Sequence, residues 1–98
     1  MLSSTGRFET PNGSKYLKQL CKHFEHKIEV RYDDHTGECA LTPGPATLNA
    51  DETGLSVHVV AQDAEELEVA KSVIDRHLER FAFREEFTSM DWRDAAVR

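Results

Sequence analysis

The sequence predicts an α+β fold in which a single antiparallel sheet is covered on one face by two helices. Two segments, 10–25 and 63–81, carry apolar residues at the spacing of amphipathic helices. Between them, short segments alternate apolar and polar residues as strands do, and the links between these segments are short. Short links favour antiparallel neighbours, so both helices should cover one face of the sheet and leave the other face open.

The first helix is preceded by a short strand, predicted over residues 5–9 with Phe8 facing inward. Thr10 and Pro11 predict the start of this helix, because threonine caps free N–H groups and proline tolerates the first helical position. The helix should end near Phe24 or Glu25. Its predicted core stripe consists of Tyr16, Leu17, Leu20, Cys21 and Phe24.

Four strands are expected between the helices. They are predicted over residues 28–32, 39–42, 46–50 and 55–61, and the third has the weakest alternation. A polar loop, a Pro-Gly-Pro break and a hairpin turn separate them at 33–37, 43–45 and 51–54. Proline cannot donate to a strand ladder and glycine permits tight turns, so these segments should interrupt the sheet.

The second helix has a strong predicted start, because Asp63 stands three residues before Glu66 in the pattern of a capping box. Its core stripe is predicted to contain Leu67, Ala70, Ile74, His77, Leu78 and Phe81. After this helix, the alternation around Met90 and Trp92 is compatible with a short closing strand, and residues 94–98 should fray. The resulting order, β-α-β-β-β-β-α, matches TATA-binding-protein-like topology, which we use for architecture alone and not as a sign of DNA binding.

Composition limits the class of protein. A chain of 98 residues with 39% hydrophobic residues supports one domain, residues 1–98, with an ordered core at about 5–92. No segment resembles a membrane span or a secretory signal. Two cysteines form no disulfide framework, so we expect a cytoplasmic protein with free thiols and no membrane contact.

The charge is unevenly distributed. The net charge of −6 argues against nucleic acid as a partner. Residues 1–32 nevertheless carry six basic groups against three acidic ones, a net charge of +3, and the remaining residues carry −9. Within the basic part, Lys15, Lys18 and Lys22 recur on one side of the first helix, away from its core stripe. This strip is either a solvated helix face or a face for an anionic partner.

Histidine and cysteine side chains are the candidates for chemistry. Cys21 and His23 point about 160° apart on an intact helix, so they cannot share one metal ion there. Cys21 is interpreted as a small buried residue, whereas His23 and His26 could hold one ion together if other ligands joined them. The alternative is two surface histidines near a helix C-terminus.

His77 is unusual because it lies within the apolar stripe of the second helix. It is either a core histidine bonded to a backbone carbonyl or a tyrosine, or a group with a ligand or proton-transfer role. The sequence contains no nucleophile elbow, phosphate loop or zinc-protease motif, and we expect no cofactor and no catalytic residue. The carboxylate pairs at 33–34, 65–66 and 85–86 should be solvated. The late aromatic residues, Phe81, Phe83, Phe87 and Trp92, should cap the core or form a dimer contact.

Two segments of the sequence carry a family resemblance. They read Tyr16-Leu17-Lys18-Gln19-Leu20-Cys21-Lys22-His23-Phe24-Glu25-His26-Lys27 and His77-Leu78-Glu79-Arg80-Phe81-Ala82-Phe83-Arg84-Glu85. Together they resemble a small bacterial family, domain of unknown function 2218. The resemblance covers roughly residues 5–92 and implies no established activity. Members of similar appearance occur alone or joined to the front of siderophore-interacting flavin reductases, which implies an accessory role in iron handling. The matching positions His23, His26, His77, Arg80 and Phe83 carry no assigned role.

The sequence supports three functional hypotheses. The leading one is a non-enzymatic accessory or binding module that docks on a partner or binds a small ligand through the basic helix face or the open sheet face. The partner would be a separate siderophore-interacting flavin reductase or another acidic protein. The second is a metal-binding domain or small metal-dependent enzyme that uses His23, His26 and His77. The third is a structural homodimer that buries the open sheet face or the late aromatic residues.

Overall fold

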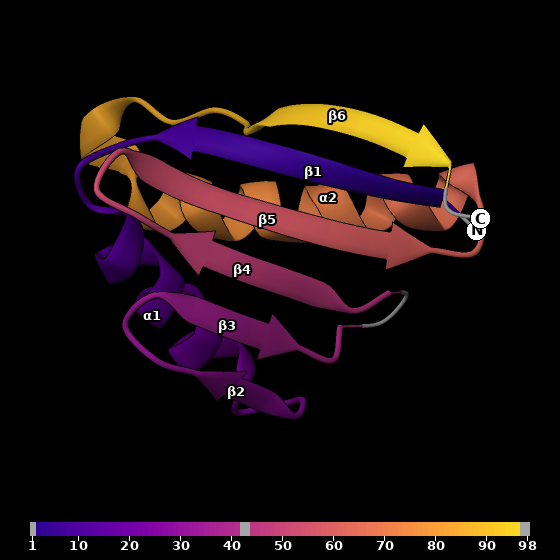
Figure 1. Ribbon diagram of the computed structural model, residues 1–98, viewed down its shortest axis with the longest axis horizontal. Coiled ribbons are helices and arrows are strands. Elements are labelled where there is room, and N and C mark those ends of the chain that lie inside the picture. Colours follow the sequence, from indigo (N-terminus) through magenta and orange to yellow (C-terminus); the bar gives the residue numbers. More distant parts are fainter. Residues whose placement is uncertain (1, 42–43, 97–98) are drawn as a thin grey trace.

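The computed structural model describes residues 2–41 and 44–96, and in this part of the chain it shows one antiparallel sheet with both helices on the same face (Figure 1). The elements are β1 (Leu2–Glu9), α1 (Gly13–Phe24), β2 (Val30–Tyr32), β3 (Thr36–Cys39), β4 (Ala46–Ala50), β5 (Gly54–Ala61), α2 (Ala64–Phe81), η1 (Phe83–Glu85) and β6 (Asp91–Ala96). The order across the sheet is β2-β3-β4-β5-β1-β6. The predicted α+β class is therefore confirmed, and the correspondence with TATA-binding-protein-like topology stays a prediction.

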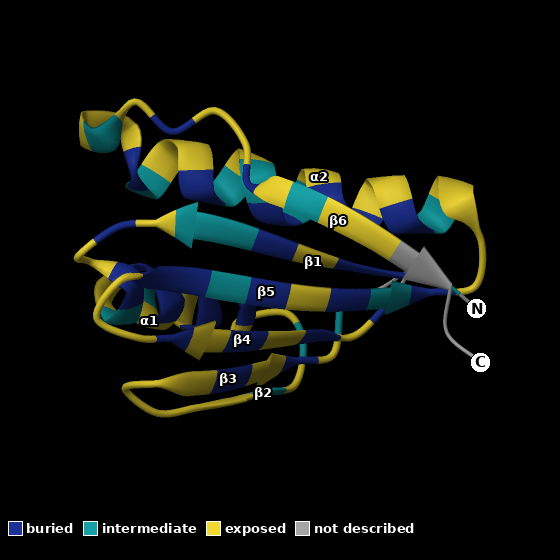
Figure 2. Ribbon diagram, turned by 45° about the horizontal axis from the view of Figure 1, so that its top comes forward, coloured by how far each residue is buried: buried dark blue, intermediate teal, exposed yellow. Residues whose placement is uncertain are grey.

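The sheet separates a covered face from an open one, because successive strand residues point to opposite sides. Along β5, Leu55, Val57 and Val59 are fully buried, whereas the intervening His58 is exposed. Figure 2 shows the same alternation of buried and exposed residues along β4. Helix α2 packs on β5 and β1, and α1 packs on β2, β3, β4 and β5. The two helices also contact each other, which brings their surfaces together at a seam.

The start of α1 differs from the prediction. The helix begins at Gly13 with Asn12 at its N-cap, and not at Thr10. The backbone N–H of Thr10 donates to the carbonyl oxygen of Thr53 at 3.0 Å, which holds this residue against the β4–β5 turn. Gly13 also lies against that turn, since an added Cβ would stand 2.5 Å from the carbonyl oxygen of Gly54. In α2, by contrast, the predicted cap is present, because the Asp63 carboxylate accepts from the backbone N–H of Glu66 at 2.8 Å.

The prediction for β3 was wrong in position. This strand begins at Thr36, inside the expected loop, and ends at Cys39. The Asp33 carboxylate accepts from the backbone N–H groups of His35 and Thr36, both at 2.8 Å, so the chain reverses sooner than its composition suggests. Of the expected strand over 39–42, Ala40 and Leu41 lie outside any strand, and Thr42 falls outside the described residues, as does Pro43.

The closing strand is present as β6, which pairs with β1 at the edge of the sheet. Residues 94–96 belong to this strand and are not frayed, while residues 97–98 lie outside the described part of the chain. The Asp75 carboxylate of α2 holds the start of β6. It accepts from the backbone N–H of Met90 at 3.0 Å and from the indole N–H of Trp92 at 2.9 Å.

The core lies between the helices and the covered face. In α2, the predicted core residues Leu67, Ala70, Ile74 and Leu78 are buried. Phe81, expected in the core, is only half-buried, because it lies at the end of the helix beside the ring of His23. Lys71 was not expected in the core, yet it is buried and pairs with Asp94 of β6 at 2.6 Å.

Candidate functional site

The seam between α1 and α2 brings together two of the three histidines singled out in the sequence. The ring centroids of His23 and His77 lie 4.6 Å apart. Both rings pack against Phe24, whose centroid lies 5.7 Å from that of His23 and 5.0 Å from that of His77. Phe81 approaches His23 at 6.2 Å. The pair is therefore held by aromatic packing on one side and reaches solvent on the other, since His23 is exposed and His77 is half-buried.

The orientation of His77 is fixed by one hydrogen bond. Its Nδ1 atom lies 2.6 Å from the backbone oxygen of Val73, one helical turn earlier. A carbonyl oxygen can only accept, so Nδ1 must carry the hydrogen. A neutral His77 ring therefore has no hydrogen on Nε2 and presents a lone pair there. The sequence predicted either a core histidine bonded to a backbone carbonyl or a tyrosine, or a group with a ligand or proton-transfer role. The bond to a backbone carbonyl is present, but the ring is only half-buried.

The surroundings of His23 are positively charged. Partial burial lowers the pKa of His23, and the positive charges of His77, Lys27, His26 and Arg80 lower it further. No acidic group is among these causes. We call His23, His26, Lys27, His77 and Arg80 the two-helix patch. Because its members are cationic or become so on protonation, the patch favours an anionic group.

An open depression adjoins the patch. Arg76, His77, Glu79 and Arg80 line a space of about 410 Å³, and Glu79 is the acidic residue among them. Beyond α2, Phe83 is 64% exposed and the guanidinium carbon of Arg84 lies 5.7 Å from its ring centroid. A shallow, largely cationic surface of this kind suits contact with another molecule more than the enclosed chemistry of an enzyme site.

The lysine strip of α1 is not buried at any of its three predicted positions. Lys18 is not free, because its Nζ lies 3.3 Å from a carboxylate oxygen of Asp34 in the β2–β3 turn. The Nζ of Lys15 lies 6.0 Å from the ring centroid of Tyr16. Lys22 stands one residue before His23, so the strip leads toward the two-helix patch along α1.

The described residues contain no group of three or more histidine, cysteine, aspartate or glutamate side chains placed to hold a metal ion. His26 is exposed, and Cys21 lies in the core with its sulfur 3.9 Å from that of Cys39. The hydrogen bond between the two thiols and burial together raise the pKa of Cys21. In this part of the chain, the seam therefore offers two nitrogen ligands without a third.

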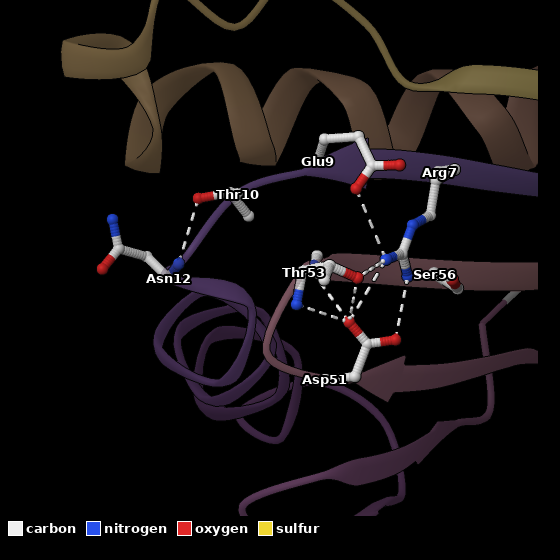
Figure 3. A network of polar contacts seen from close by, with 8 residues as sticks. Arg7, Glu9, Thr10, Asn12, Asp51, Thr53 and Ser56 are labelled. Carbon is white, nitrogen blue, oxygen red and sulfur yellow. Dashed lines mark hydrogen bonds and ion pairs between the residues drawn. The ribbon is translucent and has the colours of Figure 1, made fainter.

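A polar network on the open side of the sheet was not predicted (Figure 3). The Arg7 guanidinium donates to Ser56 at 2.9 Å and to Thr53 at 2.6 Å, and it contacts both carboxylate oxygens of Asp51. The Asp51 carboxylate also accepts from the backbone N–H of Gly54 at 2.8 Å. The bond from Arg7, followed by those from Thr53, holds the pKa of Asp51 well below its usual range. The network connects β1 to the β4–β5 turn. Its signal in the sequence was Asp51, an aspartate at the first position of the predicted turn over 51–54.

The expectation that the carboxylate pair at 85–86 is solvated was wrong for Glu85. Its carboxylate accepts from the Thr10 hydroxyl at 2.7 Å, from the Asn12 side-chain amide at 3.2 Å and from the Tyr16 hydroxyl. These bonds, that from Tyr16 first, lower the pKa of Glu85. Burial and the neighbouring carboxylate raise the pKa of Tyr16 to about 12. The cluster joins η1 to the start of α1 and is a structural tether.

The fold and the patch define a small α+β domain with an open polar sheet face and a cationic helix seam. Its sequence matches the family described as uncharacterized proteins conserved in bacteria, domain of unknown function 2218, over residues 5–93, and the chain belongs to that family. The solution structure of PA4090 from Pseudomonas aeruginosa is similar, with a TM-score of 0.76 and 24% sequence identity over 100% of this chain and 99% of the other. At this identity the likeness shows the fold alone. No curated protein matches the sequence.

Neither α1 nor α2 combines the length and the apolar composition needed to cross a bilayer, and the same holds throughout the described residues.

Proposed function

We propose that this chain is a non-enzymatic accessory module of the bacterial cytoplasm that docks on an acidic protein surface through the lysine strip of α1 and the two-helix patch that adjoins it. The observation that carries the proposal is the two-helix patch, where His23 meets only cationic neighbours among the groups that shift its pKa. On a chain with a net charge of −6, such a local excess of positive charge is not a general property of the surface. It is the arrangement that steers and orients an oppositely charged partner.

The geometry supports docking over the two rival functions. The depression beside His77 is open, and the residues that line it are Arg76, His77, Glu79 and Arg80, whereas most substrate pockets are concave and lined mainly by apolar side chains. A homodimer that buries the open sheet face or the late aromatic residues would leave the positive charges of the two-helix patch without a partner. A metal site would need ligands beyond His23 and His77.

The first partner to test is a siderophore-interacting flavin reductase, because the family resemblance of the two helix segments implies an association with such enzymes. An accessory domain that docks on a reductase would link this chain to iron or siderophore metabolism without chemistry of its own. Any other acidic protein with a complementary surface would satisfy the same electrostatic requirement.

The experiment measures binding of the reductase across a salt series. The test variant is Lys15→Glu/Lys18→Glu/Lys22→Glu, and Arg31→Glu on the open sheet face is the matched control. Exposed charge pairs each contribute about 0.2–1 kcal/mol, so reversing three lysines should weaken binding about tenfold at low salt. The difference should shrink as salt screens the charges over about 10 Å at 0.1 M. Equal affinity of wild type and triple variant at low salt would contradict the proposal, and a loss confined to Arg31→Glu would move the interface to the open sheet face.

A further inference from the structure

The Nε2 nitrogen of His77, which takes no part in the bond to Val73, determines how this residue can bind an anion. With Nδ1 donating to the backbone oxygen of Val73 at 2.6 Å, the other nitrogen of the neutral ring, Nε2, can only accept a hydrogen bond. A carboxylate is also an acceptor, so the two cannot form a hydrogen bond. Protonation changes Nε2 into a charged donor, and a charge-assisted bond to a carboxylate then becomes available. At this residue, binding of an anion and binding of a proton are therefore coupled.

His23 extends this coupling to a pair. Its ring lies 4.6 Å from that of His77, so two protonated rings would repel each other unless a negative charge lies between or beside them. An anion at this point would relieve the repulsion and favour protonation of both rings. The pair thus takes up protons when an anion arrives, and by linkage the anion binds more tightly when protons are abundant.

Most of the other charged groups at the seam act in the same direction. His26 and Lys27, from the turn after α1, and Arg80 of α2 act on His23 as positive charges. Arg76 is a further cation at the depression beside His77. Two acidic residues, Glu25 at the end of α1 and Glu79 on the depression, are exposed, so they weaken the positive potential without cancelling it. Phe24 and Phe81 supply the uncharged packing.

We infer that the His23–His77 pair is a proton-dependent carboxylate-binding subsite, which makes docking of the acidic partner tighter as the pH falls from neutral toward about 5.5. The inference rests on the proposed function, since the carboxylate is an aspartate or glutamate side chain of the partner surface. Docking on the acidic partner is therefore regulated by pH: the affinity rises under acid stress and falls at neutral or alkaline pH.

The same two nitrogens could instead serve a metal ion, and the pH dependence of binding distinguishes the two cases. A metal ion competes with protons for the lone pairs of neutral imidazoles, so its binding tightens as the pH rises. A carboxylate needs the protonated rings, so its binding tightens as the pH falls. The sign of the pH dependence therefore separates an anion subsite from a two-histidine metal site.

The experiment uses a hexaglutamate peptide as the probe, with affinity measured by calorimetry at constant ionic strength between about pH 5.5 and about pH 7.5. Glutamate side chains titrate near pH 4.3, so the peptide stays charged over this range. The test variants are His23→Gln, His77→Asn and the double variant; the asparagine amide retains an N–H that can donate to Val73. His35→Gln, an exposed histidine of the β2–β3 turn, is the control. Thermal unfolding checks that each variant is folded.

We expect wild type and His35→Gln to bind at least about tenfold more tightly at the lower pH, because one unit of pKa displacement on binding corresponds to a tenfold change in affinity. The double variant should bind with little pH dependence. An unchanged pH dependence in the double variant, or tighter binding at the higher pH, overturns the inference. Stoichiometric Zn²⁺ binding to wild type that tightens with pH and is lost in the double variant overturns it as well.

The lysine variant and the histidine variant test the proposed function and the histidine subsite separately. If the peptide binds the Lys15→Glu/Lys18→Glu/Lys22→Glu variant as tightly as wild type at low salt, docking through this face is wrong. If the triple variant loses affinity while the double histidine variant keeps the wild-type pH dependence, only the histidine subsite is wrong.

Discussion

The tether made by Glu85 gives the sharpest stability prediction. This carboxylate receives hydrogen bonds from the hydroxyls of Thr10 and Tyr16 and from the Asn12 amide, which lie 69 to 75 positions earlier in the chain. Tyr16 is buried, and Glu85 itself is half-buried. The tether therefore couples the end of α2, through η1, to the start of α1, and its loss should be felt in global stability.

The change to test is Glu85→Gln. The amide retains one acceptor oxygen, so at most one of the two hydroxyl bonds survives in its original sense, and the surviving bond loses its charge. A hydrogen bond to a charged group contributes about 1.5–3 kcal/mol and a neutral one about 0.5–1.5 kcal/mol. We therefore expect Glu85→Gln to lower the free energy of unfolding by about 2–3 kcal/mol at neutral pH, as measured by urea denaturation.

The stabilising effect of Glu85 should also depend on pH, and its direction is fixed. Because the folded state lowers the pKa of Glu85, the effect is fully present above the unfolded pKa of about 4.3 and is lost as the pH falls through the lower folded value. The difference between wild type and Glu85→Gln should therefore shrink below about pH 4. Glu86→Gln, at the exposed neighbour, is the control. A loss of less than about 0.5 kcal/mol from Glu85→Gln, or an equal loss from Glu86→Gln, would show that Glu85 is no tether.

Two further predictions concern the core. Ile74 is fully buried, so Ile74→Ala should lower the free energy of unfolding by about 2–5 kcal/mol through cavity formation, whereas Val69→Ala at the exposed face of α2 should change it by less than about 1 kcal/mol in urea denaturation. The thiols of Cys21 and Cys39 are both buried, so a thiol reagent cannot reach them, and neither should react within minutes in the folded protein. Both should react rapidly in denaturant, and immediate labelling of the native protein would contradict the burial.

The fold could be predicted where the determining interactions are local. Asp63 and Glu66 lie within one helical turn of each other, so the cap of α2 could be read from their spacing. The start of α1 could not, because Thr10 is held by Thr53 and Glu85, which are remote in sequence. The sequence left β6 uncertain for the same reason, since this strand is held by Asp75 and by its pairing with β1.

The site could be predicted in its parts but not in its assembly. Histidine inside an apolar stripe marked His77 as unusual, and helical spacing indicated that His23 and His26 could hold one ion together. The proximity of His23 to His77 depends on how α1 and α2 pack, which no local pattern reports. Lys71 was missed although it stands at a core position of α2 between Leu67 and Ile74, because its neutralising partner, Asp94, lies in β6.

The docking role of the two-helix patch can be mapped residue by residue. The decisive measurement is backbone chemical-shift mapping of the hexaglutamate peptide on isotope-labelled protein at about pH 5.5, the acidic end of the range in which histidine titrates. We predict that the perturbed residues concentrate in 15–27 and 76–84, with β3 and β4 unaffected. Perturbations concentrated on the open sheet face, around Arg7 and Arg31, or no saturable perturbation at all, would contradict docking through the patch.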